Sequence, residues 1–216
     1  MLQISQRHIV WQSGAGRKVK IGVLALQGDV AEHIASLGDC GVSASGVRNR
    51  QEIESVDALV IPGGESTTIA KLAKAFGVFD LIKSRIASGM PTYGSCAGMI
   101  LIADQILDGG ADQESFGGLD AQVRRNAFGR QVDSFETDLS FAGIGGAPFR
   151  AVFIRAPWVE SVGAGVEVLA SFNGHPVAIR QGHLLATSFH PELTGDNRIH
   201  RFFVDQLCKE SSKAGI

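Results

Sequence analysis

Residues 57–66 read Asp-Ala-Leu-Val-Ile-Pro-Gly-Gly-Glu-Ser, and they contain a strand, a turn and the start of a helix. Asp57–Ile61 is a short apolar run of the kind that is buried on both faces of a parallel sheet. Pro62-Gly63-Gly64 ends the run, and Ser66 is placed to cap a following helix. The apolar residues expected on that helix are Ile69, Leu72, Ala73 and Phe76.

The same strand–turn–helix unit recurs on both sides of this stretch. Lys20–Leu26 is an apolar strand, and Asp29–Cys40 follows it with helical spacing of its apolar residues. Further along, Val78–Ala87 predicts a helix, Pro91–Gly94 a short strand and Cys96–Leu107 an apolar helix. The alternation predicts an α/β fold: one three-layer domain with a mainly parallel central sheet flanked by helices.

The second half of the chain has a different pattern. Residues 108–149 are rich in glycine, and four short runs with strand character follow. These runs are Ala151–Ile154, Val166–Ser171, Val177–Arg180 and Leu184–Phe189. Asn173-Gly174 is a favoured two-residue hairpin turn, and Asn197–Cys208 has the spacing of a helix that packs on the sheet. We therefore expect β-rich hairpin segments and a closing C-terminal helix.

The domain organisation is expected to be simple, because 216 residues suit one well-buried core. Residues 1–18 have no clear hydrophobic period and are interpreted as a flexible N-terminal extension. Residues 19–211 form the predicted domain, and residues 212–216 a short tail.

Composition excludes several classes of function. The formal net charge is −2, and the 20 Lys and Arg residues are dispersed, so nucleic-acid binding is not expected. The sequence contains no apolar run long enough to span a bilayer and no secretory signal, which predicts a cytoplasmic protein without a membrane partner. The three cysteines are widely spaced, so neither a disulfide framework nor a metal site is expected.

The strongest chemical motif is Gly94-Ser95-Cys96-Ala97-Gly98, which lies between a predicted strand and a predicted helix. A nucleophile at such a sharp turn needs small neighbours, and it protrudes where a substrate can reach it. The start of a helix also favours thiolate over thiol. The alternative is that Cys96 is a small buried apolar residue, which is the interpretation we give to Cys40 and Cys208.

A base for that cysteine is available in Ser188-Phe-His-Pro-Glu192. Residues two apart on an extended chain point the same way, so Glu192 can orient the imidazole of His190. Taken alone, the segment could instead be a solvated strand end. The other histidines lack such a partner pattern and are expected to have surface or packing roles: His8, His33, His175, His183 and His200.

The glycine turn at Pro62–Ser66 supplies a third element. Its backbone amides can point into a cavity and stabilise the oxyanion of a tetrahedral intermediate. A phosphate-binding loop is the rival interpretation, but the lysine and the spacing that a P-loop requires are missing.

In this order along the chain, the glycine turn, the cysteine elbow and Phe189-His-Pro-Glu192 resemble class I glutamine amidotransferases. Within that class the sequence is similar to the glutaminase subunits of pyridoxal 5'-phosphate synthase, the PdxT or SNO family. The resemblance covers about residues 20–209. The segments that carry it are Leu26-Gln-Gly28, Pro62–Thr68, Arg125-Asn126, Phe128–Glu136 and Phe153-Ile-Arg-Ala-Pro157.

The resemblance implies a glutaminase that releases ammonia from L-glutamine through a Cys96–His190–Glu192 triad, without a cofactor. It implies that the amides of Gly63, Gly64 and Ala97 form the oxyanion hole. The residues that it implies for glutamine binding are Gly64, Glu65, Ser66, Arg125, Ile154 and Arg155. The implied partner is a (β/α)₈-barrel synthase subunit that accepts the ammonia.

Three alternatives stay open on the sequence alone. The chain could serve another amidotransferase complex, such as those that make GMP, anthranilate or imidazole glycerol phosphate. It could be a γ-glutamyl hydrolase, whose substrate carries a bulky amide substituent. It could be a non-catalytic subunit with the same fold, although the presence of Cys96, His190 and Glu192 argues against that alternative.

Overall fold

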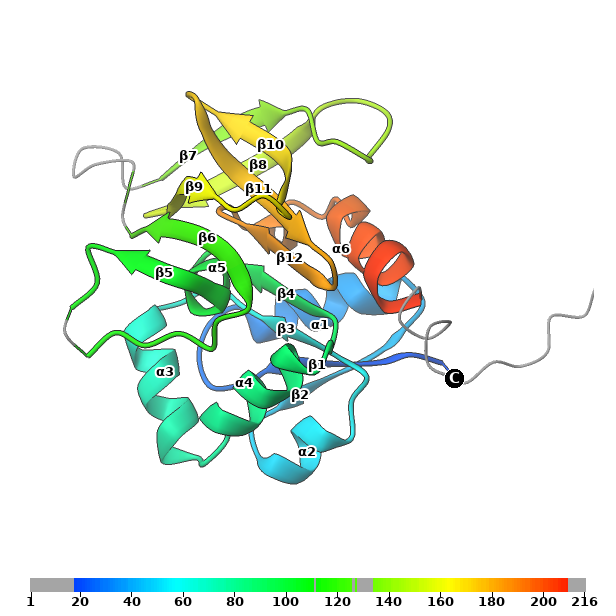
Figure 1. Ribbon diagram of the computed structural model, residues 1–216. Helices are drawn as coiled ribbons and strands as arrows, with labels where there is room; N and C mark the ends of the chain where they lie inside the picture. Colours follow the sequence, from blue (N-terminus) through cyan, green and yellow to red (C-terminus); the bar gives the residue numbers. More distant parts are fainter. Residues whose placement is uncertain (1–17, 111, 126, 128–133, 210–216) are drawn as a thin grey trace, which may run out of the picture.

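A seven-stranded sheet forms the centre of the computed structural model, which describes residues 18–110, 112–125, 127 and 134–209 (Figure 1). Its strand order is β10-β11-β12-β4-β3-β1-β2. Neighbours from β2 to β12 pair in parallel, and β11 and β10 add an antiparallel edge. The strands are β1 (Lys20–Leu24), β2 (Ser43–Val47), β3 (Ala58–Ile61), β4 (Thr92–Ser95), β10 (Glu167–Phe172), β11 (His175–Gln181) and β12 (Leu184–Thr187).

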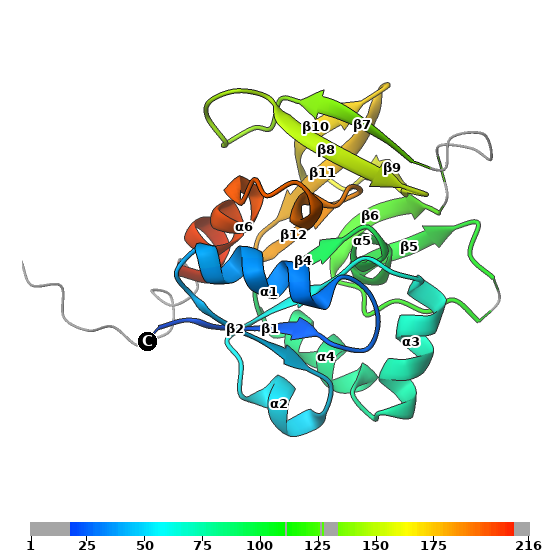
Figure 2. The same cartoon turned by 180° about the vertical axis from the view of Figure 1, so that it is seen from behind.

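Helices cover both faces of this sheet because its central strands are apolar on both sides. In β3, Ala58 and Val60 contribute to one core cluster, whereas Leu59 and Ile61 contribute to the other. The helices α1 (Val30–Asp39) and α6 (Arg198–Phe202) lie side by side over the first face (Figure 2). On the second face lie α2 (Arg50–Glu54), α3 (Ser66–Ala75), α4 (Phe79–Ala87) and α5 (Ala97–Ile102).

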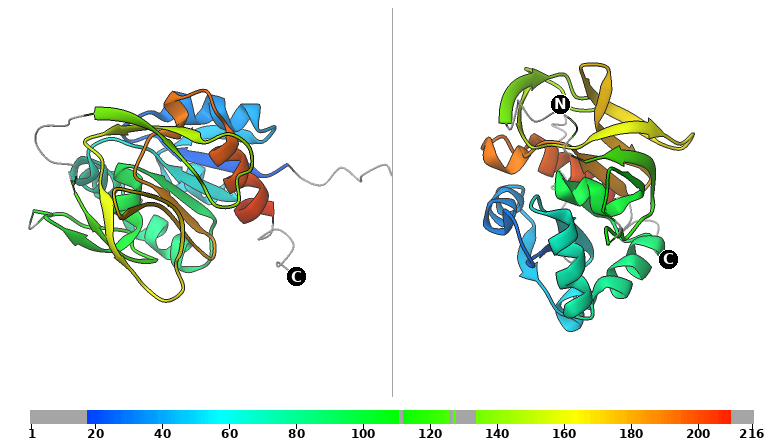
Figure 3. Two further views of the ribbon diagram at one scale, coloured as in Figure 1. Left: turned by 90° about the horizontal axis from the view of Figure 1, so that it is seen from above. Right: turned by 90° about the vertical axis from the view of Figure 1, so that its left-hand side faces the viewer.

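Two smaller sheets lie beside the antiparallel edge. One contains β5 (Ala103–Leu107), β6 (Leu119–Arg124) and β9 (Trp158–Val162), and the other pairs β7 (Ser134–Leu139) with β8 (Phe149–Ile154). Phe135, Phe153 and Phe172 pack ring against ring and join β7 and β8 to β10. Seen from above, β7, β8 and β10 lie nearest the viewer (Figure 3, left).

The predicted α/β class and the mainly parallel sheet are confirmed. The hairpin turn is also confirmed, since Asn173 and Gly174 both have positive φ, 50° and 82°, between β10 and β11. The C-terminal segment packs on the sheet as expected, with α6 followed by a π-helical turn at Phe203–Cys208. The proposed domain boundaries stay predictions, and residues 1–17 and 210–216 lie outside the described residues.

Three local predictions are wrong. The expected helix over Cys96–Leu107 ends at Ile102, because Ala103 adopts an extended backbone (ψ 144°) and starts β5. Ser66 does not cap α3; the Glu65 carboxylate does, accepting from the amides of Thr67 and Thr68 at 3.1 and 2.7 Å. Phe76 follows the last helical turn and is 53% exposed, so it does not belong to the core.

Candidate active site

Cys96 stands at a sharp turn between β4 and α5. Its backbone has φ 50° and ψ −101°, a conformation that costs energy for a residue with a Cβ atom. The turn also needs Gly98, because a Cβ atom there would lie 2.1 Å from the carbonyl oxygen of Ile61. The predicted nucleophile elbow is thus confirmed as a backbone geometry, and the Cys96 side chain lies at a cavity wall.

His190 reaches the same place from the neighbouring strand. β12 pairs with β4 in parallel, and the Cys96 amide donates to the Thr187 carbonyl oxygen at 2.8 Å. His190 Nδ1 and Glu192 Oε1 share a hydrogen bond of 2.8 Å, and the Glu192 side chain is fully buried. The pairing is as predicted, but its cause differs: Glu192 lies on the 3₁₀ turn η1 (Pro191–Leu193), not on an extended strand.

The surroundings of His190 favour its charged form. Burial opposes protonation, but hydrogen bonding with Asp29, Cys96 and Glu192 outweighs it and raises the pKa of His190 to about 12. The Asp29 carboxylate lies 3.4 Å from Nδ1, and its interaction with His190 lowers the pKa of Asp29. These contacts favour the imidazolium form of His190, which has a proton to donate.

Asp29, His190 and Glu192 are residues of types that bind metal ions. Asp29, His190 and Glu192 place donor atoms within 4.8 Å of one another. Two of these atoms, His190 Nδ1 and Glu192 Oε1, already share a proton, and a metal ion would have to displace it. The arrangement fits an imidazolium held between two carboxylates.

The predicted site residues line one cavity of about 380 Å³, apart from Gly63 and Glu192. Gly63 lies beside the cavity, where a Cβ atom would come within 2.3 Å of His190 Cε1. Glu192 is buried behind His190. Three further lining residues were not predicted as site residues: Gln27, Asp29 and Ile100.

Comparison with known proteins shows the family of the chain. Residues 23–209 match the SNO glutamine amidotransferase family. The chain belongs to this family. A relative from Mycobacteroides abscessus, named "Pyridoxal 5'-phosphate synthase subunit PdxT", is 62% identical over 87% of this chain and 96% of its own length. A relative of the same name from Streptomyces coelicolor is 60% identical over 87% of this chain and 93% of its own.

Solved structures agree with this assignment. A crystal structure of a glutamine amidotransferase has a TM-score of 0.80 and 49% identity, covering 86% of this chain and 97% of the other. A Thermoplasma acidophilum protein described as a putative GMP synthase component has a TM-score of 0.66 at 17% identity, covering 92% and 98%, and shows the shared fold alone.

In this member of the SNO family, Glu65 and Arg125 contact one another across the cavity mouth. Arg125 Nη2 donates to Glu65 Oε1 at 2.8 Å. Burial opposes the charge of Glu65, but hydrogen bonds from Thr68 and Thr67 outweigh it and lower its pKa to about 2. Glu65 is therefore an anion that caps α3 and holds a guanidinium beside the cavity.

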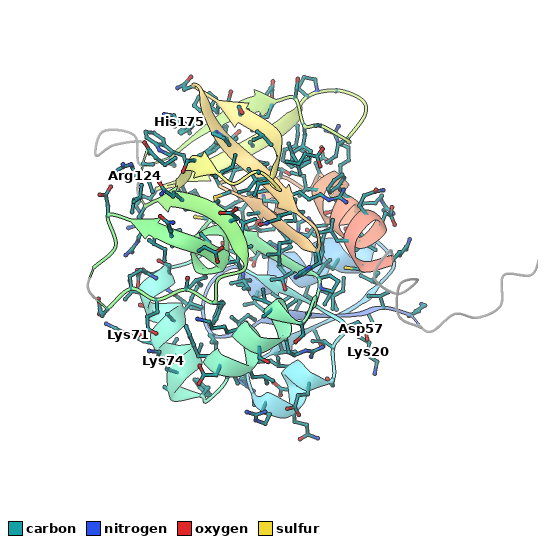
Figure 4. All side chains as sticks on the ribbon, in the orientation of Figure 1. Lys20, Asp57, Lys71, Lys74, Arg124 and His175 are labelled. Carbon is teal, nitrogen blue, oxygen red and sulfur yellow. The ribbon has the colours of Figure 1, made fainter. Side chains whose placement is uncertain are left out.

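The loop between β5 and β6 supports this wall of the site. Gln113 Oε1 accepts from the hydroxyl groups of Ser66 and Thr67 at 3.0 and 2.9 Å. Two lysines of α3, labelled in Figure 4, hold the same loop: Lys71 pairs with Asp112, and Lys74 pairs with Glu114. Asn126 and residues 128–133 of the family segments lie outside the described residues.

Two histidines expected to have surface or packing roles lie directly behind the site. His33 and His200 are both fully buried, and His33 Nε2 lies 3.4 Å from Glu192 Oε2. Neither histidine has a sequence neighbour that marks it.

In the part of the chain that the structure describes, no helix has the length and apolar character needed to cross a membrane.

Proposed function

We propose that this chain is the glutaminase subunit of pyridoxal 5'-phosphate synthase, which hydrolyses L-glutamine to L-glutamate and ammonia and delivers the ammonia to the synthase subunit. The observation that carries the proposal is the meeting of Cys96 and His190 at one cavity in a member of a glutamine amidotransferase family. The names of the 60–62% identical relatives support the assignment to this synthase over the other amidotransferase complexes.

The reaction begins at the sulfur of Cys96. With its proton on His190, Cys96 Sγ attacks the side-chain amide carbon of glutamine, a C–S bond forms and the carbonyl electrons move to oxygen. Backbone amides of Gly64 and Ala97, which line the cavity, and of Gly63 beside it stabilise this oxyanion. Each such donor is worth about 3 kcal/mol of transition-state stabilisation.

His190 then acts as an acid and afterwards as a base. It donates its proton to the amide nitrogen, the C–N bond breaks and ammonia leaves, with Cys96 held as a γ-glutamyl thioester. Water attacks the thioester carbon and gives a proton to His190, and the C–S bond breaks to release glutamate. Glu192 holds Nδ1 throughout, since its hydrogen bond favours the charged imidazole.

Substrate recognition is assigned to the polar mouth of the cavity. Arg125 presents a guanidinium to the α-carboxylate of glutamine, and Glu65 fixes the position of that guanidinium. The remaining predicted contacts line the same cavity: Gly64, Ser66, Ile154 and Arg155. Arg125→Ala should raise KM for glutamine by about 10- to 100-fold with a smaller change in kcat, measured by initial rates of glutamate release. An unchanged KM would remove Arg125 from the substrate site.

Ammonia is useful to an acceptor only before water protonates it, so the synthase subunit has to dock against this chain. We assign that partner to the (β/α)₈-barrel class, the reaction to the cytoplasm, and the glutaminase domain to residues 19–211. Glutamine turnover by the chain alone is expected to be poor and to rise when the synthase subunit is added.

Glutamate release from glutamine tests the proposal, measured with and without the synthase subunit for the wild-type chain and Cys96→Ala. The wild-type protein should show release that the partner stimulates. Cys96→Ala should show none, while it keeps its circular-dichroism spectrum and its binding to the partner. Substantial release by Cys96→Ala would refute the nucleophile, and release without stimulation would refute the assignment of the partner.

A further inference from the structure

A chain of buried polar groups continues behind the catalytic histidine. Glu192 uses Oε1 for His190, and its Oε2 faces His33 Nε2 at 3.4 Å. On the other side of the ring, His33 Nδ1 lies 2.9 Å from His200 Nε2. The side chains of His33 and Glu192 have no exposed surface, so water does not take part in these contacts. His33 comes from α1 and His200 from α6, which are remote in sequence from the elbow.

Both histidines are neutral at physiological pH. Burial is the main cause that lowers the pKa of His33 well below 6.5, and burial lowers the pKa of His200 to about 4. A neutral imidazole has one N–H and one lone pair. The contact of His33 with His200 therefore has one donor and one acceptor, and choosing the donor fixes the tautomer of both rings.

Only one choice suits the carboxylate. If His33 donated from Nδ1, its Nε2 lone pair would face the Glu192 anion at 3.4 Å, and a buried N–H of His200 would have no acceptor. If His200 donates from Nε2, His33 carries its proton on Nε2, which faces Glu192 Oε2 at 3.4 Å without the alignment of a hydrogen bond, and the atom of His200 that has no partner is then a lone pair and not an N–H. The hydrogen bond that Glu192 Oε2 accepts comes from the Ser95 hydroxyl at 3.4 Å, and the same hydroxyl lies 3.2 Å from the Phe189 carbonyl oxygen.

We propose that His33 is a positioning residue for the glutaminase reaction: its Nε2–H faces the second oxygen of Glu192 and attracts it electrostatically, and His200 sets the tautomer of His33. The inference rests on the proposed roles of His190 and Glu192. A carboxylate held from both sides keeps Oε1 directed at His190 Nδ1 while the imidazole gains and loses its proton. His33 does not line the cavity, so replacing it should change kcat and leave glutamine binding unchanged.

The chain offers a matched pair of variants. The amide nitrogen of glutamine can occupy the place of histidine Nε2, whereas that of asparagine occupies the place of Nδ1. We expect His33→Asn to lower kcat by about tenfold, the effect of losing one close polar contact with a buried charged group, with KM within about twofold of wild type. His33→Gln should retain kcat within about threefold. His183→Gln, whose histidine bonds the Ile86 carbonyl oxygen away from the site, is the control.

A second measurement does not depend on activity or on a folded variant. ¹⁵N spectra of the full wild-type chain at pH 7 should show Nε2 protonated and Nδ1 bare on both His33 and His200. A proton on Nδ1 of His33 would overturn the inference, as would equal kcat for the asparagine and glutamine variants. A wild-type chain without Cys96-dependent glutaminase activity would refute the proposed function instead, and the tautomers would still decide the hydrogen-bond arrangement.

Discussion

Replacing His200 with glutamine should reduce the fall in the free energy of unfolding as the pH is lowered. Burial lowers the pKa of His200 from 6.5 to about 4, so between these values the unfolded chain binds a proton that the folded chain excludes. The free energy of unfolding therefore falls as pH falls through this window. The shift of 2.5 units (6.5 − 4) corresponds to about 3 kcal/mol, of which about 2 kcal/mol is already lost by pH 5.

Urea denaturation of both proteins at pH 7, 6 and 5 measures this difference. The comparison concerns the slope with pH, because the substitution also changes stability at pH 7. The wild-type chain should lose about 2 kcal/mol more than His200→Gln between pH 7 and pH 5. Burial, the main cause that lowers the pKa of His33, is present in both proteins, whereas the smaller effect of a charged His200 is lost in the variant and flattens its curve further. Parallel curves for the two proteins would refute the assignment of a buried neutral imidazole at position 200.

Three further substitutions test the catalytic geometry. Glu192→Gln should lower kcat by about 100-fold or more and move the alkaline loss of kcat/KM to lower pH, because it lowers the pKa of His190. Asp29→Asn should move the alkaline loss of kcat/KM less than Glu192→Gln does, because the Asp29 carboxylate is 39% exposed and lies 3.4 Å from His190 Nδ1. Equal shifts for the two variants would contradict this prediction. Gly63→Ala should lower kcat by about 100-fold, because the methyl group meets His190; Gly38→Ala, with no atom within 4 Å, is the matched control and should leave kcat unchanged.

The parts of the fold that sequence could predict are those with strong periodicity. Strands β1 and β3 are apolar runs, and α1, α3 and α4 have clear helical faces; β4 is a buried Thr-Tyr-Gly-Ser segment that follows the Pro91 expected to begin it. The edge strand β2 was not predicted, because the side chains of Ser43–Val47 are small and mostly exposed. The run Cys96–Leu107 is apolar apart from Asp104 and Gln105, and its pattern does not show that the chain turns at Ala103 to enter another sheet.

The candidate site likewise contains some residues that the sequence predicted and others that it did not. Cys96 and His190 stand in short motifs whose glycine and proline neighbours reveal a special backbone, and the structure brings them to one cavity. His33 and His200 have no such neighbours, and Asp29, although it follows Gly28, was not predicted as a site residue. Their positions follow from the packing of α1 and α6 on one face of the sheet, which pairs residues up to 167 positions apart. Patterns within a single sequence do not record that pairing.

The pairing of β12 with β4 also sets when the site can come into existence. A ribosome adds the elbow with Cys96 long before it adds His190, and until β12 arrives the outer edge of β4 has no strand to pair with. His190 joins the chain 94 residues (190 − 96) after Cys96. Contacts of such sequence separation form late and slowly. On the proposed mechanism, a nascent chain is therefore inert toward glutamine until β12 has paired with β4.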